Sequence, residues 1–155
     1  MKPITVRRQC GATLLEALVA ILIFSFGVLA IIGLQAASIR NTTQAKMRAD
    51  AAFLANQIIG VMWADNHANL LSYAHRADGT DCGISGTDSG NARVISWIGS
   101  TTTSGTILGT LPGSATAKPR ITVDSATHLV TVTVCWQGPQ DATPHSYVTA
   151  AQING

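Results

Sequence analysis

Residues 17–39 form a run of 23 consecutive uncharged residues, mostly alanine, leucine, isoleucine, valine and phenylalanine. At a rise of about 1.5 Å per residue this run spans roughly 34 Å as a helix, enough to cross a hydrocarbon core of about 30 Å. A bilayer core offers the backbone no water, so only a helix satisfies every peptide group of such a segment. The run therefore predicts one membrane span.

A secretory signal peptide also combines a basic start with an apolar run, but its apolar region is usually about 7 to 15 residues long. Here the run is longer, and it continues into more helical sequence. The basic residues Lys2, Arg7 and Arg8 precede the run and should stay on the cytoplasmic side. Everything after residue 39 is then expected in the periplasm or outside the cell.

The sequence from Arg40 to about Tyr73 favours a helix that continues from the span, because it holds no proline and only one glycine, Gly60. Its apolar positions approximate one helical stripe, made of Ile39, Met47, Phe53, Leu54, Ile58, Val61, Met62 and Leu70. We expect one helix of about 60 residues whose second half packs on the downstream domain.

The downstream domain is expected to be rich in β-structure. A loop rich in glycine, aspartate, serine and threonine covers residues 76–92. Strand patterns follow at Arg93–Ile98, Arg120–Val123, Thr127–Trp136 and His145–Ala150, with a hairpin turn at 124–126. The stretch 99–119 is predicted to be a surface loop with at most one short edge strand. The expected fold class is α+β, with a small antiparallel sheet packed on the distal half of one long N-terminal helix.

Cys82 and Cys135 both lie in the part expected outside the cytoplasm, where thiols are oxidised, so they predict a disulfide. The bond would tie the loop 76–92 to the strongest strand. Zinc held by these thiols with His128 or His145 is the alternative, which the lack of a paired C-x-x-C spacing disfavours.

Other chemistry-bearing residues are expected to have structural or surface roles. Asp78, Asp81 and Asp88 lie in a glycine-rich loop but do not follow the pattern of a calcium-binding EF-hand. His67 and His75 are expected to be surface histidines. The three tryptophans are expected in the core, with an exposed subunit contact as the alternative; they are Trp63, Trp97 and Trp136.

Several function classes are disfavoured by the sequence. Only 12% of the residues are charged, which argues against a broad basic nucleic-acid surface. No catalytic constellation, phosphate-binding loop or dinucleotide fingerprint occurs. We therefore expect no enzymatic activity, no cofactor and no metal.

The boundary before the apolar run reads GATLLEAL over residues 11–18. It resembles the prepilin signal of the type IV pilin superfamily. That resemblance implies cleavage after Gly11 by a prepilin peptidase and N-methylation of Ala12, which stands where phenylalanine is commonest. In filaments of this family the glutamate, here Glu16, is thought to neutralise the terminal amine of a neighbouring subunit. The alternative from physical chemistry alone is that Glu16 reaches the lipid headgroups.

The apolar run and a strand reading VTVTVCWQ together resemble the minor pilins of the PilV type, the type IV pilus modification proteins. This resemblance implies priming or modification of pilus assembly. The implied partners are prepilin peptidase, other minor and major pilins, the inner-membrane assembly platform and membrane lipid, without nucleic acid. Major pilins usually carry both cysteines in the last third of the chain, whereas Cys82 and Cys135 lie 53 positions apart. A minor pseudopilin of type II secretion and a membrane-anchored periplasmic binding module are the alternatives.

The expected segments are a leader (1–11), a transmembrane and filament-core helix (12–39), its amphipathic continuation (40–74) and a periplasmic β-rich domain (75–155). The expected location is the bacterial inner membrane, with a cytoplasmic N-terminus, and then the pilus. Removal of the leader would change the formal charge from +2 to −1 and remove Cys10. The basic charge of the chain is thus expected to act in orientation rather than on the working surface.

Overall fold

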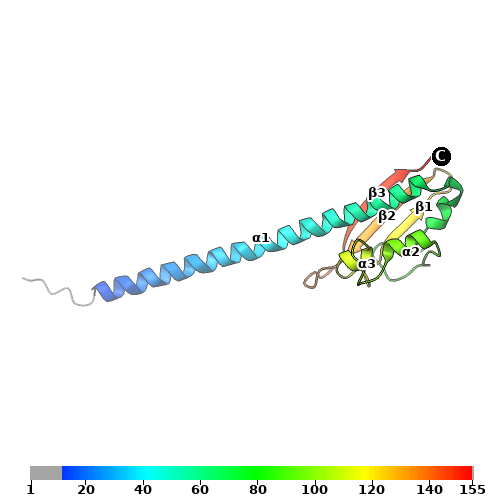
Figure 1. Cartoon of the computed structure of the whole chain (residues 1–155). Coiled ribbons are helices and arrows are strands. Elements are labelled where there is room, and N and C mark those ends of the chain that lie inside the picture. The colour runs from blue at the N-terminus through cyan, green and yellow to red at the C-terminus, as the bar shows by residue number, and fades with distance from the viewer. Residues whose placement is uncertain (1–11, 155) are drawn as a thin grey trace, which may run out of the picture. The chain divides into compact units, whose positions relative to one another are not determined.

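The computed structural model describes residues 12–154. The chain divides into two compact units, Met1–Thr43 and Gln44–Gly155. Helix α1 (Ala12–Ala64) supplies all the described structure of the first unit and begins the second (Figure 1). The second unit holds the sheet and the shorter helices.

Helix α1 ends at Ala64, earlier than the sequence predicts. The side chain of Asn66 accepts a hydrogen bond from the Ala68 amide and caps a 3-10 helix, η1 (His67–Tyr73). Asparagine is a favoured cap because its short side chain satisfies a free backbone donor at a helix start. The predicted helical segment up to Tyr73 is therefore two helices rather than one.

Three strands form an antiparallel sheet in the order β1-β2-β3 within the described residues. They are β1 (Arg120–Val123), β2 (Leu129–Trp136) and β3 (His145–Gln152). Asp124 closes the β1–β2 turn, because its carboxylate accepts hydrogen bonds from the amides of Ala126 and Thr127. The fold class is α+β, as predicted, and the three downstream strands match their predicted positions to within a few residues.

The core of the second unit lies between the distal part of α1 and the sheet. The helix buries a stripe at spacings of three and four residues, consisting of Ala51, Leu54, Ala55, Ile58 and Met62. Val130, Val132 and Val134 of β2 belong to the same cluster. Burial of one large aliphatic side chain such as Leu54 or Ile58 contributes about 1.5 to 3 kcal/mol.

Phe53 and Trp63 do not belong to this core, contrary to the sequence-based expectation. Phe53 is 64% exposed and Trp63 is 53% exposed. Each residue advances about 100° around a helix, so a side chain directly before a buried position such as Leu54 turns away from the sheet. Trp97 and Trp136 are buried, as expected.

The prediction of a strand over Arg93–Ile98 is wrong, because this segment lies in helix α2 (Ala92–Ile98). The Asn91 side chain accepts a 2.9 Å hydrogen bond from the Arg93 amide and starts the helix. Val94 and Trp97, three positions apart, are buried on one face. This spacing of three fits a helix, although the residue types of Arg93–Ile98 also favour a strand.

The stretch 99–119 is not simply a surface loop. It contains the short helix α3 (Ile107–Thr110), and Ile107 and Leu111 are buried in the core. The hydroxyl of Ser114 donates to the Leu111 carbonyl at 2.7 Å and holds the turn that follows. Within the described residues no part of this stretch joins the sheet.

Candidate functional site

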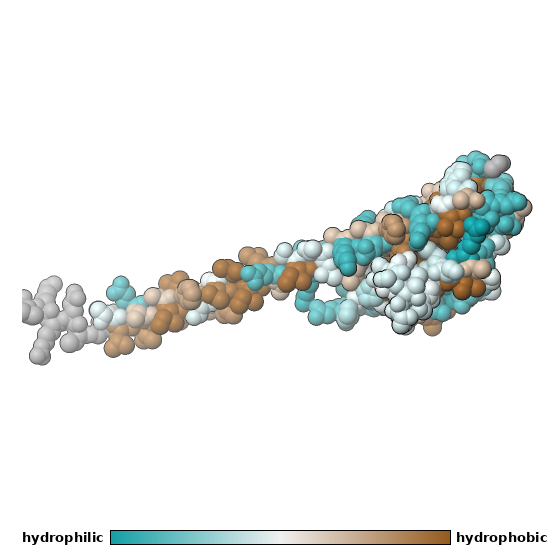
Figure 2. Space-filling model, in the orientation of Figure 1, coloured by the Kyte–Doolittle hydropathy of each residue, from teal (hydrophilic) through white to brown (hydrophobic). Residues whose placement is uncertain are grey.

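The first unit presents an exposed apolar helix. Its large side chains are mostly more than half exposed; examples are Leu14 at 71%, Phe24 at 72% and Leu34 at 73%. The most apolar 18-residue window of α1 has a mean hydropathy of 2.8 and is 0% buried. Figure 2 shows these brown side chains along the first half of the helix. By length and composition α1 can cross a membrane.

Glu16 is exposed near the start of α1 and is the first acidic residue of the described chain. Ala12 is the first residue of the helix. The other predicted processing residues, Lys2, Arg7, Arg8 and Gly11, lie outside the described residues. Cleavage after Gly11, methylation of Ala12 and docking through Glu16 therefore stay predictions.

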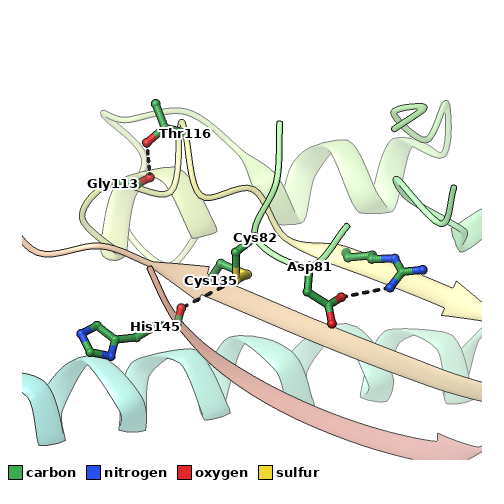
Figure 3. Close-up of a disulfide and its surroundings, with 7 residues drawn as sticks. Asp81, Cys82, Gly113, Thr116, Cys135 and His145 are labelled. Atoms are coloured by element: carbon green, nitrogen blue, oxygen red, sulfur yellow. Dashed lines mark hydrogen bonds and ion pairs between the residues drawn. A yellow bond between two sulfur atoms is a disulfide. The ribbon is translucent and has the colours of Figure 1, made fainter. Parts of the chain in front are cut away.

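A disulfide joins Cys82 to Cys135, with the Cα atoms 5.4 Å apart (Figure 3). It anchors the loop that follows η1 to the face of β2 opposite the Val132 side chain. The same loop is held by Arg120 of β1, whose guanidinium contacts the Asp81 carboxylate at 3.0 Å. The structure thus has the disulfide that the sequence predicts. Both cysteines that the zinc alternative would use, Cys82 and Cys135, are joined in this bond.

Asp78, Asp81 and Asp88 all form hydrogen bonds or ion pairs with residues of this protein. Asp78 accepts hydrogen bonds from the amide and the hydroxyl of Thr87, and these bonds lower the pKa of its carboxyl. Asp88 forms an ion pair with Arg76, whose hydrogen bond lowers the pKa of that carboxyl. Arg76 is almost fully buried and also donates to the Ile84 carbonyl. These hydrogen bonds and ion pairs account for the acidic residues of the loop as structural contacts.

The histidines differ from the expectation. His75 is only 3% exposed, because its backbone bridges to Ile121 of β1. Its Nδ1 accepts a 3.0 Å hydrogen bond from the Ser89 amide, and desolvation by burial lowers the pKa of the His75 imidazole. His67 is half-buried and meets His128 edge-on, with ring centroids 4.5 Å apart. The prediction of surface histidines is thus wrong for His75.

Within residues 12–154 no group of three or more histidine, cysteine, aspartate or glutamate side chains could hold a metal ion. His145 lies beside Asp141 rather than a thiolate, with its Nε2 3.2 Å from the Asp141 carboxylate. His128 lies at the end of the β1–β2 turn, where its amide donates to the Asp124 carbonyl. These placements give both histidines structural contacts.

The family comparison concerns the N-terminal segment. Residues 6–32 match the model of the prokaryotic N-terminal methylation motif. The chain therefore carries a type IV pilin-like prepilin signal. Neither the curated proteins nor the solved structures give a match.

The junction at the start of β3 is a feature that sequence reasoning missed. Gln44 of α1 donates to the Asp141 carboxylate at 3.0 Å, and the Trp136 indole N–H donates to the Gln44 side-chain oxygen at 3.4 Å. The sequence signal for this contact is a polar glutamine on the helix face that meets the β2–β3 loop. This junction also borders a cavity.

Proposed function

We propose that this chain is a minor pilin that primes or modifies type IV pilus assembly after cleavage by a prepilin peptidase and N-methylation. The observation that carries the proposal is the methylation motif at residues 6–32, which continues directly into an apolar helix with exposed side chains. An ordinary membrane anchor needs the apolar helix but not the motif. The α+β fold with a long N-terminal helix supports the same assignment.

The proposed mechanism uses one apolar surface twice. Residues 12–39 first lie in the inner membrane, with the leader (1–11) in the cytoplasm and residues 40–155 in the periplasm. After cleavage the same apolar side chains leave lipid and pack against the helices of neighbouring pilins. Because lipid tails and apolar side chains solvate this surface almost equally, the transfer needs little net desolvation energy.

Glu16 is proposed to fix the register of this transfer. An ionised carboxylate costs about 2.5 to 3.5 kcal/mol at the centre of a bilayer, so it favours a position with a cationic partner. Cleavage after Gly11 creates such a cation, the N-methylated amine of Ala12 in a neighbouring subunit. Pairing of Glu16 with that amine would place each new subunit at one height in the filament.

Mass spectrometry of the chain from its native membrane tests the assignment. A mature chain that begins with N-methylated Ala12 is expected, and Gly11→Leu is expected to leave the precursor uncut because the bulky side chain blocks the peptidase site. Gly33→Ala is the matched control, since no atom lies within 4 Å of an added Cβ there and processing should be unchanged.

Two results would point elsewhere. An intact Met1 terminus in the membrane-embedded protein would contradict the pilin assignment and favour an anchored periplasmic binding module. A correctly processed chain whose deletion stops protein secretion but leaves pili intact would favour a type II secretion pseudopilin.

A further inference from the structure

Strand β3 forms one edge of the sheet, and no segment of residues 12–154 pairs with its outer side. The Ile153 amide donates to the His128 carbonyl at 3.0 Å, which makes these opposite residues a hydrogen-bonded pair. Bonded and non-bonded pairs alternate along an antiparallel ladder. The backbone groups of Ser146, Val148 and Ala150 therefore point outward, away from β2.

This edge lacks the features that usually prevent another strand from pairing with it. β3 is eight residues long and contains no lysine, arginine, aspartate, glutamate, proline or glycine. Natural sheets commonly protect an exposed edge with such residues or keep the edge strand short. The opposite edge is partly covered by the chain itself, since the His75 backbone forms one bridge to that of Ile121 in β1, with hydrogen bonds of 2.9 and 3.0 Å. One edge is thus partly covered, and the other is open.

A cavity of about 420 Å³ lies at the start of β3. It is lined by Gln44, Ala45, Arg48, Trp136, His145 and Ser146. Arg48 forms no ion pair with the described residues. The nearby Asp141 carboxylate is already bonded to the Gln44 side chain, to the Gly138 amide and to His145. Arg48 is thus an exposed cation of this lining that has no ion-pair partner among the described residues, while the Asp141 carboxylate beside Gln44 and His145 is already engaged in contacts with this protein.

We propose that β3 receives an antiparallel strand from another polypeptide, and that the free C-terminal carboxylate of that strand binds Arg48. A strand antiparallel to β3 ends beside the residue where β3 begins, His145, and so directs its C-terminus to the cavity. Strand addition supplies main-chain hydrogen bonds, and capture of the carboxylate fixes the register. Apart from His145, the side chains of β3 are uncharged, so uncharged β-branched residues fit beside them on the two faces of the added strand.

A second copy of this chain fits the site poorly. In that copy β3 is followed by Ile153, which is 3% exposed and bonded through its amide to His128. That residue cannot extend into a neighbour's cavity without leaving its own core. The donor is therefore the end of a different polypeptide, and this inference goes beyond the assembly role proposed above without depending on it.

The test uses the full chain in detergent and a fluorescein-labelled octapeptide of alternating threonine and valine. The peptide is prepared with a free C-terminal carboxylate and, separately, as the C-terminal amide. Fluorescence anisotropy is expected to show binding of the acid form at least tenfold tighter than binding of the amide, because a charge-assisted contact is lost. Equal affinities, or no binding of either peptide, would overturn the proposal.

Two variant pairs separate the carboxylate contact from the strand contact. Arg48→Ala should abolish the preference for the acid form, whereas Lys46→Ala, at an exposed position that does not line the cavity, should retain it. Ala150→Pro removes one outward amide and should weaken both peptides about tenfold, whereas Ala150→Val keeps the amide and should not. Circular dichroism checks that each variant is folded.

A backbone-modified peptide gives a readout that does not depend on any variant. Methylation of the peptide amides that would face β3 should abolish binding, and undiminished binding of the methylated peptide would refute strand addition. Self-association of the chain that the octapeptide reverses would show that a second copy occupies the edge, which also contradicts the proposal. Failure of these binding tests would leave the N-terminal processing result unchanged.

Discussion

The phenol of Tyr73 donates a 2.6 Å hydrogen bond to Oδ2 of Asp65, joining the end of η1 to the residue that follows α1. Tyr73 is 0% exposed, whereas Asp65 is partly exposed and also lies 3.5 Å from the guanidinium of Arg93 in α2. Three elements therefore meet at one carboxylate. This contact fixes where the long helix ends and where the chain turns back towards the sheet.

Replacement of Tyr73 by phenylalanine is expected to lower the free energy of unfolding at pH 7 by about 1 kcal/mol, because the ring stays buried and one hydrogen bond is lost. Urea denaturation of the full chain in detergent, followed by tryptophan fluorescence, measures the change. Leu71→Ala is a suitable control, since Leu71 is 57% exposed in the same helix and should be nearly neutral. An equal effect of both changes would contradict a specific role for the phenol.

The same contact predicts how stability depends on pH. Desolvation raises the pKa of Tyr73 from 10.0 to about 12, and the hydrogen bond to Asp65 adds to the rise. A raised pKa means that the unfolded chain loses the phenol proton first, so stability should fall between pH 10 and pH 12. The Tyr73 hydrogen bond also lowers the pKa of Asp65 below 3.8, and that contribution should be lost as pH falls through the folded-state value. Tyr73→Phe should reduce both dependences in denaturation curves measured across pH.

Loss of the Cys82–Cys135 bond is expected to destabilise the second unit. Closing a loop across this separation of 53 positions restricts the unfolded chain by about 4 kcal/mol in the chain-entropy model. The double variant Cys82→Ser, Cys135→Ser and the reduced wild type should therefore unfold at similarly low urea concentrations. Dithiothreitol should have no effect on the double variant, and a large effect there would contradict the assignment of the stabilisation to this bond.

The sequence predicted best the elements with a strong local composition signal. The strand β2 is rich in β-branched residues, and the apolar run of α1 has only one state that satisfies its backbone in a membrane. The strand prediction for Arg93–Ile98 was wrong because these residues favour a strand by type but also fit one helical face. The Asn91 side chain, which accepts a hydrogen bond from the Arg93 amide, starts a helix there. The prediction that His75 lies at the surface was wrong because its burial depends on a backbone bridge to Ile121. The two residues lie 46 positions apart, so no local sequence pattern reveals this contact. The processing residues before Ala12 lie outside the described residues, so their roles stay predictions.

Substitution of Trp97 should destabilise the protein strongly, whereas substitution of Trp63 should have little effect. The Trp97 indole is 5% exposed and donates a 2.8 Å hydrogen bond to the backbone carbonyl of Leu54, which fastens α2 to α1. Trp97→Ala is expected to cost about 3 to 5 kcal/mol through the cavity that it leaves. Trp63 is 53% exposed, so Trp63→Ala should change the unfolding free energy by less than about 0.5 kcal/mol. A large destabilisation by Trp63→Ala would show that the sequence-based expectation of a core tryptophan was right after all.

Glu16→Gln tests the proposed docking charge separately from processing. Glutamine has nearly the same shape and keeps hydrogen-bonding capacity, so cleavage after Gly11 and membrane insertion should proceed as in the wild type. The amide cannot neutralise a neighbour's terminal amine, so the amount of this subunit in sheared pili should fall at least tenfold, as measured by quantitative immunoblotting. Glu16→Asp keeps the charge on a side chain one methylene shorter and should restore part of the incorporation. If Glu16→Gln is incorporated as well as the wild type, the carboxylate serves only to position the helix end at the headgroups.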